Sequence, residues 1–88
     1  MIPRLIDLQR HPAHEPFVTL FVWYNDNNWV KAQRAFNEVW GAERAFWESK
    51  NEALPDERIT SSVINKLYVE LRARWDDHRR PGQELMPN

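Results

Sequence analysis

The sequence predicts a small, mainly helical domain in which two long helices form an antiparallel hairpin next to a short N-terminal strand or third short helix. Apolar residues recur at three- and four-residue spacing over residues 28–51 and again over residues 56–79, as they do on one face of an amphipathic helix. Between the two stretches stands Pro55, which disfavours helical geometry in the residue before it. A connection this short implies antiparallel neighbours, and 88 residues are enough for one domain.

Residues 1–16 are predicted to form an irregular arm, because three prolines limit regular structure to a short piece over residues 4–9. Two histidines of this arm, His11 and His14, lie three residues apart, and on a helix they could share a metal ion. Pro12 between them indicates a loop instead, and the chain contains no cysteine. We therefore expect no metal site and no cofactor.

Residues 17–24, FVTLFVWY, are rich in β-branched and aromatic side chains and are followed by four Asn and Asp residues. This composition favours a strand of typical length. Both faces of that strand would be apolar, so it would need cover on both sides. A short buried helix with Pro16 in its first turn is the alternative, and periodicity alone does not separate the two. We predict the strand and keep the helix as the alternative.

The helix predicted over residues 28–51 holds three of the five tryptophans and begins at Asn27 or Asn28, which are favourable N-cap residues. It has two apolar edges. The edge of small side chains, which suits close approach of the second helix, consists of Ala32, Ala35, Val39 and Ala42. The edge of large side chains, left for residues 17–24 or for a partner, consists of Trp29, Phe36, Trp40 and Trp47.

The second long helix is predicted over residues 56–79, where one apolar face runs from Val63 to Trp75. Asp56 or Thr60 can cap its start, and Pro81 with the glycine that follows stops it. Residues 80–88 are predicted to form a frayed tail.

Glu43 lies on the helical wheel between the two apolar edges. A carboxylate in such a position should be paired or should take part in chemistry. We predict a structural hydrogen bond to Tyr68 or to an arginine of the facing helix or of another subunit. Catalysis would need a second titratable group nearby, and the spacing of the chain supplies none. The sequence therefore predicts no catalytic residue and a protein that is not an enzyme.

The formal net charge is -1, and no third of the chain departs from neutrality by more than one charge. Such a balance predicts neither long-range attraction to a phosphate backbone nor a wholly acidic surface that imitates one. A cluster near the C-terminus is the alternative, a site for nucleic acid, nucleotide or phosphate formed by Arg72, Arg74, Trp75, Arg79 and Arg80. Asp76 and Asp77 interrupt it, and we favour basic residues that stabilise the end of a helix.

The apolar surplus predicts a non-enzymatic protein–protein interaction module, either an adaptor or an inhibitor of a larger protein, that also associates with itself as a homodimer. Trp and Tyr dominate interface hot spots. The predicted protein-binding residues are Trp23, Tyr24, Trp29, Phe36, Trp40, Glu43 and Trp47. We expect a cytoplasmic location without a signal peptide or a membrane span, because cysteine is absent and the longest apolar run, over residues 17–24, is far shorter than a span of about 20 residues.

Overall fold

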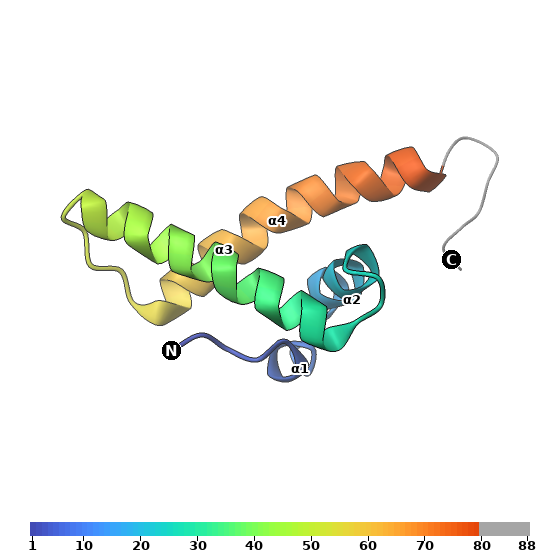
Figure 1. The fold of residues 1–88 in the computed structure, drawn as a ribbon, viewed down its shortest axis with the longest axis horizontal. Helices are drawn as coiled ribbons and strands as arrows, with labels where there is room; N and C mark the ends of the chain where they lie inside the picture. The colour runs from blue at the N-terminus through green and yellow to red at the C-terminus, as the bar shows by residue number, and fades with distance from the viewer. Residues whose placement is uncertain (80–88) are drawn as a thin grey trace.

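The computed structural model describes residues 1–79, with backbone only for residues 78 and 79. This part of the chain is mainly helical and contains no strand, so the predicted fold class is confirmed at that level. The helices, shown in Figure 1, are α1 (Leu5–Leu8), α2 (Glu15–Tyr24), α3 (Trp29–Ser49) and α4 (Asp56–Arg79). None of them combines the length and apolar character that crossing a bilayer requires. The predicted tail, residues 80–88, lies outside the described residues.

The predicted strand over residues 17–24 is wrong, because these residues form most of α2. A strand needs a neighbour for its backbone N–H and C=O groups, and no described segment offers one. A helix satisfies the same groups internally, and Pro16 stands in its first turn, where the missing N–H costs nothing. The apolar character of both faces now has its reason: α2 buries Phe17, Val18, Leu20, Phe21 and Val22.

The chain turns from α2 into α3 through a short polar segment. Asn25 is buried and its side-chain amide donates to the carbonyl of Phe21 at 2.8 Å. The next two residues, Asp26 and Asn27, take left-handed backbone conformations with φ of 62° and 54°, which Asp and Asn tolerate better than most residues. Asn28 then caps α3, since its side chain accepts from the amide of Lys31 at 3.0 Å.

A different polar turn reverses the chain between α3 and α4. Asn51 has a φ of 59°, and the amide of Glu52 donates to the carbonyl of Trp47 at 3.1 Å. A left-handed residue with this bond is the usual way to close the C-terminus of a helix. The carbonyl of Pro55 accepts from the amides of Arg58 and Ile59 at the start of α4.

Helix α4 crosses α3, and α2 lies in the angle between the N-terminal half of α3 and the C-terminal half of α4 (Figure 1). The described chain is elongated, with extents of 48 × 23 × 22 Å. Aromatic rings fill the angle: Phe36 of α3 has its ring centroid 6.3 Å from Phe17 and 6.2 Å from Phe21. Trp40 is also buried, and its indole N–H donates to the Thr60 hydroxyl of α4 at 2.9 Å.

The predicted division of α3 into two edges is therefore only partly correct. Phe36 and Trp40 belong to the edge left for residues 17–24 or for a partner, and of these two the core has residues 17–24 on Phe36. Their prediction as protein-binding residues is wrong, because both are buried, and Ala42, assigned to the interface with α4, is exposed. The physical reason is α2, whose helical form brings Phe17 and Phe21 onto Phe36 of α3.

Replacing Phe36 by alanine tests this core. The side chain is fully buried, so we expect the Phe36→Ala variant to lose about 3–5 kcal/mol of unfolding free energy, measured by urea denaturation. The matched control is Val69→Ala at a position that is 73% exposed, where the change should stay within about 0.5 kcal/mol. Equal stability of the wild type and the Phe36→Ala variant would contradict the described core.

Candidate protein-binding surface

The structure separates the residues predicted to bind a protein. Phe36 and Trp40 are core residues, so their role is structural. Trp23 is half-buried and packs edge-to-face on Trp75, with ring centroids 4.8 Å apart. Tyr24 is exposed and lies under the guanidinium of Arg74, which is 5.2 Å from its ring centroid.

Trp29 is the predicted binding residue that lies in an exposed apolar cluster. It is 40% exposed and shares a shallow hollow of about 380 Å³ with Ile6, which is 49% exposed, and Val30, which is 62% exposed. The other residues that line the hollow are Arg4, Gln33 and Arg34. We call these six residues the Trp29 surface. Ile6 and Val30 are absent from the residues predicted from the sequence.

Two helices build the Trp29 surface, because Ile6 belongs to α1 and the other two apolar residues open α3. The side chain of Gln33 joins the helices. Its carbonyl oxygen accepts from the amide of Leu5 at 2.7 Å, and its amide donates to the carbonyl of Pro3 at 3.2 Å. Leu5 and Leu8, the first and last residues of α1, have buried side chains. This docking turns Ile6 outward, beside Trp29.

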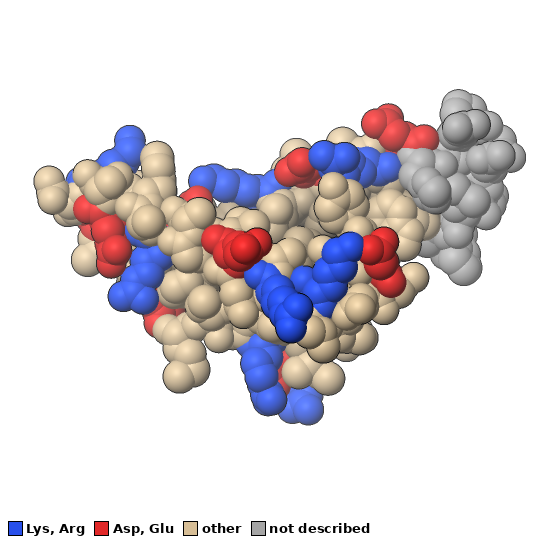
Figure 2. Space-filling view, in the orientation of Figure 1, with Lys and Arg blue, Asp and Glu red and all other residues tan. Residues whose placement is uncertain are grey.

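The charges at the Trp29 surface are positive. Arg4 forms two hydrogen bonds with the carboxylate of Asp7, at 2.9 and 3.2 Å, and these bonds lower the pKa of Asp7. Arg34 makes no hydrogen bond or ion pair with any described residue. The six residues include two arginines and no carboxylate. On the face in Figure 2, acidic and basic side chains are mixed, without a large area of one sign.

Glu43 and Trp47, two further predicted binding residues, belong to a polar cluster between α3 and α4. The Glu43 carboxylate accepts from the ammonium of Lys66 at 2.8 and 3.0 Å, from the hydroxyl of Ser62 at 2.6 Å and from the indole of Trp47 at 3.0 Å. The partners thus differ from the predicted Tyr68 or arginine. Burial raises the pKa of Glu43, but these hydrogen bonds together outweigh burial and hold the pKa below its ordinary value. Glu43 therefore joins the two long helices.

Three residues of the predicted C-terminal arginine cluster, Arg72, Arg74 and Trp75, have described side chains, and these have separate surroundings. Trp75 is buried, so its ring is not a platform for stacking a base. Arg74 pairs with Glu70 at 3.2 Å, and the Arg72 guanidinium lies 5.9 Å from the ring centroid of Tyr68. The side chains of Arg79 and Arg80 lie outside the described residues.

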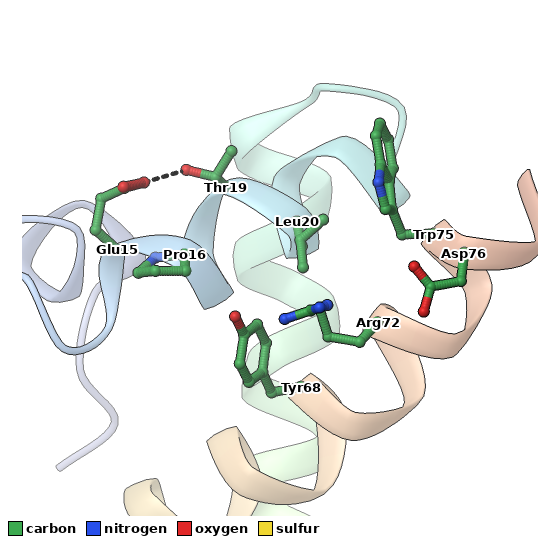
Figure 3. Close-up of a pocket in the computed structure, with 8 residues that line it drawn as sticks. All are labelled: Glu15, Pro16, Thr19, Leu20, Tyr68, Arg72, Trp75 and Asp76. Carbon is green, nitrogen blue, oxygen red and sulfur yellow. Dashed lines mark hydrogen bonds between the residues drawn. The ribbon is translucent and has the colours of Figure 1, made fainter. Parts of the chain in front are cut away.

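Arg72 also lines a hollow of about 350 Å³ between α2 and α4, shown in Figure 3. Two carboxylates, Glu15 and Asp76, line the same hollow, and Glu15 accepts from the Thr19 hydroxyl at 2.6 Å. A phosphate group placed there would meet two negative charges and one positive charge, so the hollow does not suit an anion.

No protein-family model, curated protein or solved structure matches this chain. Within the described residues, no group of three or more His, Asp or Glu side chains is placed to hold a metal ion. The conclusion on function therefore depends on the geometry of the chain itself.

The lowered pKa of Glu43 predicts how stability changes with acid. The unfolded chain binds the proton more readily than the folded chain, so the stabilisation is complete above about pH 5 and is lost as the pH falls through the lowered pKa. Glu43→Gln removes this titration. We expect the variant to be less stable than the wild type by about 1–2 kcal/mol at neutral pH, and the difference to shrink by about pH 3.

The measurement is the free energy of unfolding of the wild type and of Glu43→Gln, obtained by urea denaturation between neutral pH and about pH 3. The matched control is Glu48→Gln, five residues further along α3, where the carboxylate is exposed and its one ion pair with a described residue is with Arg44. Its effect should stay below about 0.5 kcal/mol. A loss in Glu43→Gln that is the same at every pH would show that the charge of Glu43 does not stabilise the fold.

Proposed function

We propose that this chain is a non-enzymatic protein-binding module that uses the Trp29 surface to hold another protein chain. One observation carries the proposal: Trp29 stands exposed beside Ile6 and Val30, although Phe36 and Trp40 of the same helix are buried. Contiguous exposed apolar side chains usually mark interaction sites. Trp and Arg are also the residues that most often dominate binding energy at interfaces.

The helical frame supports this use of the surface. The helical hairpin predicted from the sequence, α3 with α4, serves in the proposal as a rigid support, with the Glu43 cluster and the Trp40–Thr60 bond joining its helices. Rigid elements present an interface without the entropy cost of ordering a loop. An adaptor and an inhibitor would both work in this way, and the absence of cysteine favours a cytoplasmic location for either.

The test replaces Trp29 by alanine in the full chain. We expect the variant to keep the helical circular dichroism of the wild type, because the side chain lies at the surface. Immobilised wild type, Trp29→Ala and Val69→Ala are exposed to the same cell extract, and retained proteins are quantified by mass spectrometry. We expect at least one protein to be retained by the wild type and by Val69→Ala but to bind Trp29→Ala with an affinity lower by at least about tenfold. This loss corresponds to about 1.4 kcal/mol of binding free energy.

Val69→Ala is the control because it also truncates an exposed apolar side chain to alanine. Val69 belongs to α4 and lies outside the Trp29 surface. If every retained protein binds Trp29→Ala as well as it binds the wild type, the proposed surface is not the binding site.

A further inference from the structure

We infer that the partner of the Trp29 surface is a short segment of another protein, in which a bulky apolar side chain is flanked by Asp or Glu. The partner is not a second copy of this chain. The inference rests on the proposed function and names the chemistry of the partner. It differs from the homodimer predicted from the sequence.

The first step is the charge of the side chains that line the hollow. Arg34 has no partner among the described residues, and the bonds of Arg4 to Asp7 use only its Nε and Nη2 atoms. Both guanidinium groups therefore have N–H groups free to donate to a carboxylate of a partner. Arginine binds carboxylates in a fixed, bidentate geometry. The whole chain has a net charge of -1, so the excess of positive charge is local to this surface.

The second step is the contrast with neighbouring hollows. The hollow between α2 and α4 in Figure 3 contains Glu15 and Asp76 with one arginine. Another hollow, beside Tyr24, contains Glu70, which pairs with Arg74. In both hollows the protein supplies its own counter-charge. At the Trp29 surface only Arg4 has such a counter-charge, so a partner that brings a carboxylate gains most there.

The third step excludes a second copy. In a two-fold dimer the same patch faces itself, so the two arginines of one copy would face a patch that also carries two arginines and no carboxylate. Like charges across an interface are costly. The six residues of the surface also fall well short of the roughly 20–30 residues that each side of a stable interface usually contributes. A surface this small suits one anchoring side chain of a short segment.

A lipid surface is the competing partner, because Trp and Arg also favour membrane interfaces. Two arginines contribute roughly 1 kcal/mol each of binding free energy toward an anionic leaflet. Inserting three partly exposed apolar side chains adds little more binding free energy. Together they fall short of stable anchoring, so we favour the protein segment and include vesicles in the test.

The experiment selects a random peptide display library on the immobilised full chain. We expect enriched peptides to combine Trp, Phe, Leu or Ile with Asp or Glu within about one helical turn, about four residues. A synthetic peptide of the enriched sequence should bind the wild type and weaken at least about tenfold on Arg34→Glu. The same peptide with its acidic residues changed to Lys should prefer Arg34→Glu over the wild type.

Arg58→Glu is the matched control, because it makes the same charge change at an exposed position of α4 outside the surface. It should retain the affinity of the wild type. Enriched peptides that need Trp29 but carry no acidic residues would overturn the inference and leave the proposed function intact. Peptides that bind Trp29→Ala equally well, or no enrichment at all, would overturn both.

Two further measurements complete the test on the purified chain. Sedimentation equilibrium giving a dimer that dissociates on Trp29→Ala would assign the surface to a second copy and overturn the inference. Cosedimentation with phosphatidylserine–phosphatidylcholine vesicles that is lost on Trp29→Ala would assign it to a membrane and overturn the inference as well. A monomer that stays in solution with these vesicles supports it.

Discussion

The contact of Phe36 with the rings of Phe17 and Phe21 determines how the rest of the chain is arranged. A chain of 88 residues buries only about 60–65% of its unfolded surface, so few contacts carry most of its stability. This cluster holds α2 in the angle between α3 and α4, and the large side chains in the middle of α3 are covered as a result. Trp29, at the first residue of α3, stays outside that cover.

Local signals predicted the two long helices. Apolar spacing marked their faces, Asn28 marked the start of α3, and Pro55 precedes the first residue of α4. The composition of residues 17–24 favours a strand, while their apolar pattern fits a buried helix equally well. The decision between the two depends on whether another strand is present to pair with them, which is a property of the whole fold.

The candidate surface was only partly predictable for a related reason. Trp29 and Phe36 lie on one side of the predicted helix, and only the position of α2 makes one exposed and the other buried. Ile6 is 23 residues from Trp29 in sequence and reaches it through Gln33, a polar residue without a distinctive local pattern. For Glu43, the wheel position predicted a buried and paired carboxylate, while the choice of Lys66 and Ser62 follows from how α3 crosses α4.

The composite Trp29 surface exists only if Gln33 holds α1 on α3. Amide hydrogen exchange at Leu5 measures this contact directly, because that amide donates to the Gln33 side chain. Gln33→Leu should raise the Leu5 exchange rate at least about tenfold while the amide of Phe36 keeps its protection, and Gln9→Leu, the same change at a residue outside the contact, should leave both amides unchanged. A Leu5 amide that exchanges at the same rate in the wild type and in Gln33→Leu would contradict the composite surface.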